Sequence, residues 1–93
     1  MRVSCYKPMT IKTKADAKEF LRCFTGELYV ETEKEDAILE SYCGKNEHYK
    51  GQKWVSTRPK SDRGNIFAPY VQTLESAEDY IYHNRKHFNR VIK

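Results

Sequence analysis

A short phrase built around threonine recurs three times in the 93 residues of this chain, at Thr13, Thr32 and Thr73. Each copy carries Ile or Val two positions before the threonine and Asp, Glu or Ser three positions after it. Threonine suits the N-cap of a helix because its hydroxyl accepts a hydrogen bond from the first turn, and a polar residue at the third helical position completes a capping box. The phrase therefore predicts three junctions at which a strand gives way to a helix.

An apolar pattern of helical period follows each threonine. After Thr13 the pattern is carried, at spacings of three and four, by Ala17, Phe20, Leu21 and Phe24. Gly26 comes next and is suited to end a helix, because glycine adopts the left-handed conformation without penalty. We therefore expect helices over about residues 14–24, 33–42 and 74–89.

Two segments rich in β-branched and aromatic residues, 54–57 and 66–72, predict strands. The turn-forming residues between them predict a β-hairpin, and Pro69 places the second strand at a sheet edge or next to a bulge, because proline donates no ladder hydrogen bond. Further strands are expected over 27–31 and within 3–11. The chain is thus expected to be a small α+β protein, with about three helices packed on a short sheet of three or four strands in the order (β)αβαββα.

The length of the chain allows one hydrophobic core, so residues 1–93 are expected to form a single domain. Aromatic residues make up 13% of the chain, which argues against global disorder. No apolar run reaches the roughly 18 residues of a membrane span, and the N-terminus lacks the apolar segment of a secretory signal. The cysteines, Cys5, Cys23 and Cys43, form no Cys-x-x-Cys pair. We therefore expect the thiols to be reduced and the protein to be cytoplasmic.

The net charge of +4 is unevenly distributed along the chain. Lysine and arginine balance aspartate and glutamate in residues 1–50, so the whole excess lies in residues 51–93. Residues 27–40, by contrast, hold six acids and a single lysine. This asymmetry predicts two surfaces of opposite sign.

Two basic clusters are the candidate binding surfaces, because each mixes cations with aromatic or imidazole rings. The residues of the first cluster are Tyr49, Lys50, Lys53, Trp54, Arg58, Lys60 and Arg63. Those of the second cluster are Tyr82, His83, Arg85, Lys86, His87 and Arg90. Each cluster also has a purely structural interpretation. The first would be a solvated loop, and the second a set of cations that favour the C-terminal end of a helix dipole.

Asp79, His83 and His87 are spaced four residues apart and would share one face of a helix. A zinc site would need further ligands, of which His48 and Cys43 are the available ones. Because the pattern is incomplete, a solvated histidine pair is the preferred interpretation, and no metal or other cofactor is expected. The sequence also lacks paired carboxylates, a nucleophile–base pair and a glycine-rich phosphate loop, which favours a non-catalytic protein.

In size and basicity the chain resembles small microbial ribonuclease toxins, which cut RNA with Arg, Tyr, His and Lys side chains on a compact sheet. The resemblance implies catalytic roles for Tyr82, His83, Arg85 and His87. It lies in size and charge alone, so an enzyme of this kind is the second alternative to the functions that follow.

In its brevity, its Lys, Tyr and Asn content and its free cysteines, the chain resembles accessory proteins of bacteriophages and mobile elements. The resemblance implies a small binding protein that occupies the surface of a host or defence protein, as an inhibitor or modulator. Tyrosine and tryptophan side chains often anchor protein interfaces, and the candidates here are Tyr49, Trp54, Tyr70 and Tyr82. We therefore expect a protein partner and no membrane. The first alternative is a nucleic-acid-binding module that uses residues 49–63 and 82–93.

Overall fold

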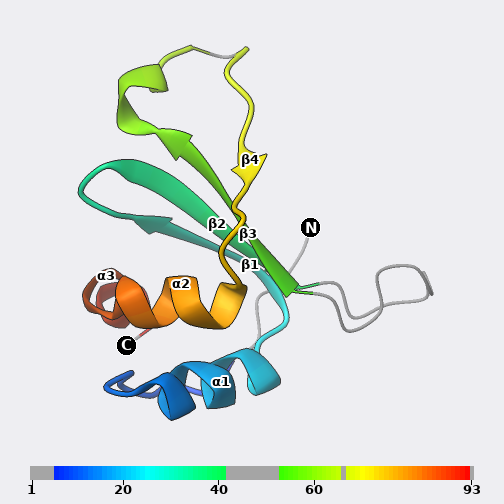
Figure 1. The fold of residues 1–93 in the computed structure, drawn as a ribbon, viewed down its shortest axis with the longest axis vertical. Coiled ribbons are helices and arrows are strands. Elements are labelled where there is room, and N and C mark those ends of the chain that lie inside the picture. The colour runs from blue at the N-terminus through cyan, green and yellow to red at the C-terminus, as the bar shows by residue number, and fades with distance from the viewer. Residues whose placement is uncertain (1–5, 42–52, 66, 93) are drawn as a thin grey trace, which may run out of the picture.

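The structure of the chain is a computed structural model that describes residues 6–41, 53–65 and 67–92 (Figure 1). Its elements, in chain order, are α1 (Lys14–Cys23), β1 (Gly26–Glu31), β2 (Glu35–Ser41), β3 (Lys53–Pro59), the 3₁₀ turn η1 (Lys60–Asp62), β4 (Val71–Gln72), α2 (Ala77–His83) and α3 (Arg85–Val91). Within these described ranges, three helices pack with a four-stranded antiparallel sheet, which confirms the expected α+β class. The order of these elements, αββββαα, departs from the expected (β)αβαββα.

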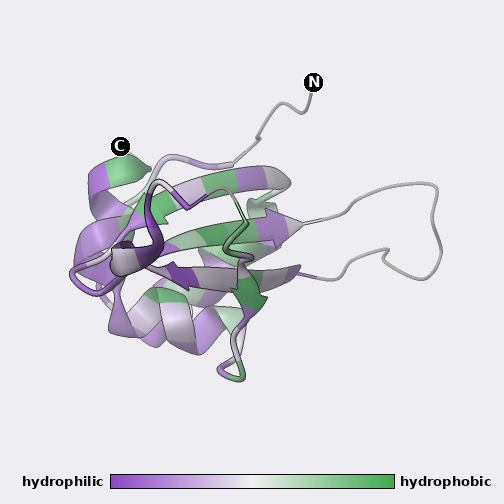
Figure 2. Ribbon diagram, turned by 90° about the horizontal axis from the view of Figure 1, so that it is seen from above, coloured by the Kyte–Doolittle hydropathy of each residue, from purple (hydrophilic) through white to green (hydrophobic). Residues whose placement is uncertain are grey.

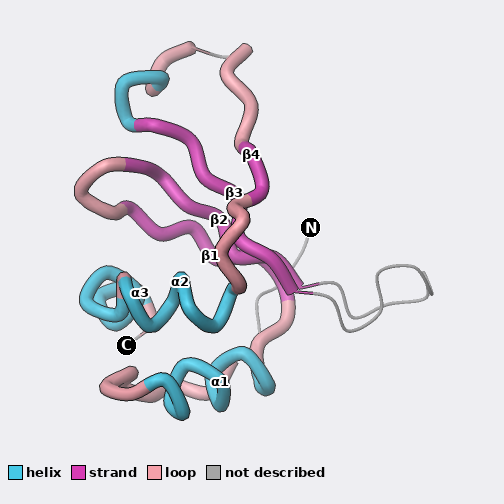
Figure 3. The backbone as a smooth tube through the Cα atoms, viewed as in Figure 1, coloured by secondary structure: helices cyan, strands magenta, loops and turns pink. Residues whose placement is uncertain are grey.

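The strands are arranged in the spatial order β1-β2-β3-β4, and every neighbouring pair is antiparallel. Side chains alternate across the sheet, so Leu28, Leu39 and Val55, which lie in register on three adjacent strands, share one face and are all buried. β4 pairs through two residues only and forms an edge among the described strands (Figure 3). The expected antiparallel pairing of these two segments and the edge position are therefore confirmed, but the strand predicted over 66–72 is reduced to Val71–Gln72, and Pro69 precedes it.

The helices cover one face of this sheet (Figure 1). α2 packs against β3, α3 packs against β1, and α1 packs mainly against α2. The largest fully buried side chains are Phe20, Phe24, Phe88, Ile11, Leu39, Ile81, Ile92 and Val55. Burial of these side chains stabilises the fold by roughly 25 cal/mol for each Å² of apolar surface removed from water. Figure 2 views the molecule from the side opposite α1, where the strands are not covered by helices.

Thr13 caps α1 as predicted. Its Oγ1 accepts a hydrogen bond from the backbone N–H of Asp16 (3.2 Å), and the Asp16 carboxylate accepts one from the N–H of Thr13 (3.1 Å). This reciprocal box satisfies donors that the start of a helix leaves unpaired. Gly26 follows the helix with a φ of 108°, a conformation that favours glycine, and begins β1.

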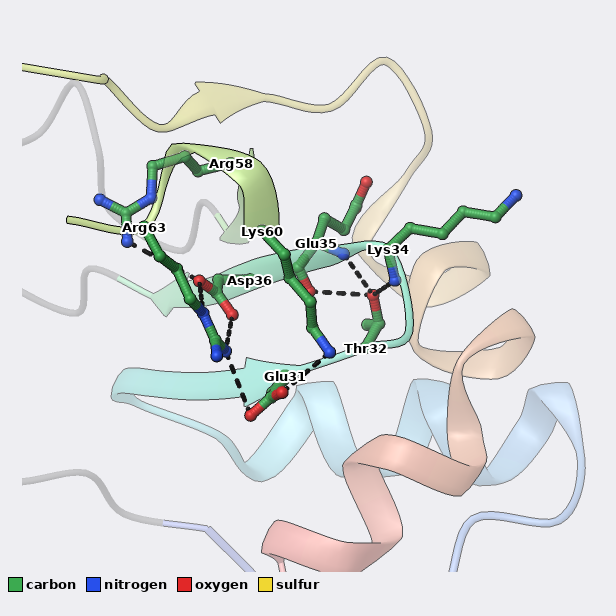
Figure 4. Close-up of polar contacts among 8 residues, drawn as sticks. All are labelled: Glu31, Thr32, Lys34, Glu35, Asp36, Arg58, Lys60 and Arg63. Atoms are coloured by element: carbon green, nitrogen blue, oxygen red, sulfur yellow. Dashed lines mark hydrogen bonds and ion pairs between the residues drawn. The ribbon is translucent and has the colours of Figure 1, made fainter. Parts of the chain in front are cut away.

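The helix predicted over 33–42 is wrong, because residues 35–41 form strand β2. Thr32 instead closes the turn between β1 and β2 (Figure 4). Its N–H donates to the Glu35 carbonyl (2.9 Å), and its Oγ1 accepts from the N–H groups of Lys34 (3.4 Å) and Glu35 (3.1 Å). A turn can thus use the same side-chain-to-backbone hydrogen bonds as a helix N-cap.

β2 is a strand because neighbours on both sides complete it. The register pairs Ala37 with Val30 of β1 and with Thr57 of β3, and alternate side chains of β2 are buried. The spacing of Ala37, Ile38 and Tyr42 suggested a helix, but so short an apolar run fits a half-buried strand equally well. Pairing with β1 and β3 decides between the two, since it satisfies the backbone of β2 along both edges.

The helix predicted over 74–89 begins later and is interrupted. Ser76 rather than Thr73 caps α2, and its Oγ accepts a backbone hydrogen bond from the first turn (3.1 Å). Thr73 belongs to the sheet, where its N–H donates to the carbonyl of Val55 (2.9 Å). Asn84 separates α2 from α3 because its φ of −112° and ψ of 25° are not helical.

Residues 6–12 contain none of the strand that was expected within 3–11, and residues 1–5 lie outside the described part of the chain. Residues 44–52, whose polar composition predicts a loop, also lie outside it. Among the described residues, no helix combines the length and the apolar character that crossing a membrane requires.

Candidate functional site

Two carboxylates bind three cations at the end of β3 and just after it, namely Arg58, Lys60 and Arg63 (Figure 4). Arg63 pairs with Asp36 through two hydrogen bonds, Nε to Oδ2 at 3.0 Å and Nη2 to Oδ1 at 2.6 Å. Glu31 accepts from both Lys60 (2.8 Å) and Arg63 (3.2 Å). Arg58 Nη2 lies 3.7 Å from Asp36 Oδ2. These contacts fasten η1 and the residues after it to the β1–β2 hairpin.

The same ion pairs change the acidity of the two carboxyl groups. The hydrogen bond from Arg63 holds the pKa of Asp36 below its ordinary value, and Lys60 and Arg63 together lower the pKa of Glu31. A carboxylate stabilised in this way contributes stability above its unfolded-state pKa and loses it as the pH falls through the lowered folded value. The cations predicted to bind a partner therefore first serve to hold the fold together.

The face of the sheet opposite the helices carries a group of aromatic side chains, which we call the outer face. Since Leu28 and Val55 are buried against the helices, their strand neighbours point the other way. The residues of the outer face are Tyr29, Ile38, Trp54, Arg58 and Tyr70. The exposed fraction of Tyr29 is 61%, and it lies in register with Ile38.

Tyr70 joins the outer face from the segment that returns toward β4. The guanidinium carbon of Arg58 lies 4.7 Å from the centre of the Tyr70 ring, a cation–π arrangement. A shallow groove of about 240 Å³ runs beside this pair and is lined by Tyr29, Asp36, Arg63 and Tyr70, among others. The outer face therefore combines tyrosine rings with arginine, and acids lie beside them.

A second feature, which we call the β4 edge, consists of residues 67–74. It exposes large apolar side chains to solvent, with exposed fractions of 86% for Phe67, 63% for Val71 and 106% for Leu74. No charged residue occurs from Gly64 to Leu74, the longest uncharged run in a chain that is 32% charged. Exposed apolar side chains that lie together are characteristic of protein interaction sites.

The histidine-bearing helix gives no metal site among the described residues. His83 Nδ1 lies 2.7 Å from Glu75 Oε1, and Asp79 pairs with Lys14 of α1, so the carboxylate of the predicted stripe is engaged elsewhere. Nδ1 of His87 is buried, and no hydrogen-bond partner for it occurs in the part of the chain that the structure describes. The remaining ligands considered from the sequence, His48 and Cys43, lie outside the described part of the chain.

Some residues of the two predicted basic clusters line the same groove, which we call the basic groove. Its cationic and imidazole side chains are Lys60 from η1 and Lys86, His87 and Arg90 from α3. The groove has a volume of about 210 Å³ and is also lined by Glu31, Thr32 and Glu33. Lys86 Nζ lies 3.9 Å from Glu33, a loose contact across the groove. This mixed site holds more positive than negative side chains.

Two further predicted residues stack on each other at the end of α2. The guanidinium of Arg85 lies 4.8 Å from the centre of the Tyr82 ring and donates to the Tyr82 carbonyl (3.0 Å). Tyr80 of α2 donates from its buried hydroxyl to Glu35 of β2 (2.6 Å). Burial and this carboxylate raise the pKa of Tyr80. The bond ties α2 to the start of β2.

The other predicted residues lie apart from the basic groove. Tyr49 and Lys50 are outside the described residues, and Lys53 and Trp54 begin β3. Sequence reasoning missed the exposed residues Tyr29, Phe67, Val71 and Leu74. Two signals were present: the strand alternation around Tyr29, and the uncharged run that ends at Leu74.

The outer face, the β4 edge and the basic groove are thus the three surfaces with a composition suited to binding. No protein-family model, curated protein or solved structure matches the chain, so these surfaces alone carry the argument about function.

Proposed function

We propose that this protein is a non-catalytic binding module that docks onto another protein through the outer face of its sheet. The observation that carries the proposal is the exposure of Tyr29 beside the stacked pair of Arg58 and Tyr70, on the side that the helices leave uncovered. Tyrosine, tryptophan and arginine are the side chains that most often dominate the binding energy of protein interfaces. Their gathering on one side of a small sheet favours a protein partner.

The charges around the outer face support the same kind of partner. Glu27 and Glu40 lie in register toward one end of the β1–β2 pair, while Arg58 and Arg63, paired with Asp36, lie toward the other. A surface with both signs suits a partner of complementary pattern, and such complementarity steers association and fixes orientation. A phosphate backbone, which is negative throughout, would be repelled at the acidic end.

Co-purification from a bacterial lysate, with and without nuclease treatment, tests the proposal. The wild-type protein is expected to retain a partner after nuclease treatment. Tyr29→Ser is expected to weaken binding at least about tenfold, the effect of losing an interface anchor. Val91→Ser removes an exposed apolar side chain from α3 and serves as the matched control, with binding unchanged. Loss of every partner on nuclease treatment, or equal binding by Tyr29→Ser, would contradict the proposal.

The proposal includes the role expected from the sequence, in which the bound partner is a host or defence protein whose activity is inhibited or modulated. Once the partner is identified, its activity is measured at increasing molar ratios of the binding module. A change that saturates near one equivalent supports this role. An unchanged activity at saturating binding would reduce the proposal to a binding module without inhibition.

The basic groove favours nucleic-acid binding as a second candidate function, because it brings Lys60 to the α3 residues Lys86 and Arg90. A phosphate would have to displace Glu33 from Lys86, since both line the groove. Gel-shift titrations at several salt concentrations test this candidate. Replacing Lys86 and Arg90 by Ala should reduce the slope of log affinity against log salt by about 1.5, as two phosphate contacts are lost.

The matched control for that titration removes the same charge from another surface. Lys7→Ala combined with Lys18→Ala changes exposed lysines far from the groove in the sequence and should leave the slope unchanged. Equal slopes in both double variants would show that net charge alone attracts the nucleic acid. No retention at low salt would exclude this function.

One structural observation supports the ribonuclease alternative. His83 and His87 line a common groove with Glu35 and Lys86. Imidazole and carboxylate side chains are the usual general acids and bases. An RNA cleavage assay without metal tests this alternative. It compares the wild type with the His83→Ala, His87→Ala double variant. Absence of cleavage by the wild type removes this alternative.

A further inference from the structure

The β4 edge is short, which is one usual safeguard of an exposed strand, but among the described residues it has no charged side chain and no covering strand. Edge strands are usually guarded by charged side chains, especially lysine, by proline within the strand or by a covering element. Here the segment from Gly64 to Leu74 has no charge, and Pro69 stands before the strand rather than in it. Phe67, Val71 and Leu74 are exposed instead. Such an edge is suited to pair with another strand.

The direction of the backbone groups can be read from the pairing with β3. Thr73 donates its N–H to Val55 of β3 (2.9 Å), and Val71 is opposite Thr57 of β3. In an antiparallel pair, alternate residues turn both N–H and C=O to the same neighbour. Gln72, between them, therefore turns its N–H and C=O away from β3. Among the described residues, no strand lies on that side to receive them.

We propose that the β4 edges of two copies of this chain pair antiparallel about a two-fold axis at Gln72. In this register each Gln72 gives its N–H to, and accepts from, Gln72 of the other copy. Tyr70 then lies opposite Leu74 of the other copy, since antiparallel partners are placed symmetrically about the axis. The two sheets join into one continuous sheet, and the outer faces of both copies point to the same side.

A second copy is the occupant that this edge favours, because the outward N–H and C=O of Gln72 are complementary to those of a symmetry mate. Each copy carries +4, so the copies repel one another at long range and their contact must form where charge is absent. The run from Gly64 to Leu74 is the longest such stretch in the chain. In this register Leu74 becomes a neighbour of Tyr70 of the other copy, which removes apolar surface from water. Because the strip is short, the dimer should be weak, with a dissociation constant in the micromolar range.

Sedimentation velocity over a protein concentration of about 1 to 500 μM tests the proposal, because this interval brackets a micromolar dissociation constant. The wild type should shift from monomer to dimer across it. Gln72→Pro removes the outward N–H without touching a bond to β3, and should remain monomeric. Gln72→Ala keeps the N–H and is the matched control, which should dimerise like the wild type. Circular dichroism and the thermal midpoint check that the fold persists.

Leu74→Asp provides a second variant that leaves the backbone unchanged. The side chain of Leu74 is fully exposed, so the substitution does not disturb the core, but it places a charge opposite Tyr70 of the other copy, in a contact that otherwise has no charge. This variant should also stay monomeric. A wild type that remains a monomer at all concentrations would overturn the proposal. So would a dimer that persists in both Gln72→Pro and Leu74→Asp, and neither result would bear on docking through Tyr29.

Discussion

Two neighbouring stretches, residues 58–63 and residues 64–74, have opposite chemistry. Residues 58–63, from the end of β3 to the end of η1 and Arg63, are rich in cations, and each of these cations contacts Asp36 or Glu31 of the β1–β2 hairpin. Residues 64–74 carry no charge and expose Phe67 and Leu74. The cations of the first stretch thus bind carboxylates within the fold, whereas Phe67 and Leu74 of the second stretch face solvent. A cluster of charge in a sequence can therefore serve the fold rather than a partner.

Asp36→Ala should give the largest effect on stability. The variant removes the paired hydrogen bonds of Arg63 and the contact of Arg58, and Asp36 is largely buried. A hydrogen-bonded charged pair of this kind contributes about 2 kcal/mol. Urea unfolding should show a lower midpoint at an unchanged slope. Glu40→Ala, an acid on the same strand, should cost less than about 0.5 kcal/mol, and an equal loss in both variants would contradict the account.

The free energy of unfolding should also decrease as the pH falls, and part of this decrease should depend on Asp36. The pKa values of Asp36 and Glu31 are lowered in the folded protein, so their contribution is complete above the unfolded-state values of about 4 and is lost as the pH falls through the folded values. Asp36→Asn should flatten the decline in unfolding free energy between about pH 5 and pH 3. A decline as steep as that of the wild type would show that other carboxylates cause it.

Thr32→Ala and Thr13→Ala should each destabilise the protein by about 1 kcal/mol, the usual cost of losing a capping hydroxyl. The two variants should differ in the part of the structure where amide exchange becomes faster. The turn at Thr32 also holds Lys60, whose N–H donates to the Lys34 carbonyl (3.2 Å), so Thr32→Ala should speed amide exchange at Lys60. Thr13→Ala should speed exchange only in α1. Unchanged exchange at Lys60 would show that the salt bridges alone hold this segment.

Phe67→Ser and Leu74→Ser should give the smallest effect on stability, within about 0.5 kcal/mol, because both side chains are already in solvent. Their effect should appear in association instead, as a weaker dimer at equal concentration. Urea unfolding and sedimentation measured on the same samples separate the two quantities. A clear loss of stability in either variant would mean that the β4 edge is part of the core.

The fold was predictable where local hydrogen bonds decide it. Thr13 and Asp16 lie three residues apart and form their box without help from the rest of the chain. At Thr32 the same phrase makes a turn, because the choice between helix and strand for β2 depends on pairing with β1 and β3. That choice involves partners distant in sequence, which a local pattern does not contain.

The site was less predictable for the same physical reason. The role of Arg63 is set by Asp36, which lies 27 residues earlier in the chain. Lys60 reaches the α3 cations only through the fold. Tyr29, by contrast, could be placed on the outer face from its position between Leu28 and Val30, since alternate side chains of a strand point to opposite faces.

The central claim is that this protein binds through the outer face rather than through its cations. The most direct measurement compares the amount of partner retained from a nuclease-treated lysate by Tyr29→Ser and by the Lys86→Ala, Arg90→Ala double variant. The account predicts that Tyr29→Ser loses the partner and that the double variant retains as much as the wild type. Retention by Tyr29→Ser together with loss by the double variant would contradict it and assign binding to the basic groove.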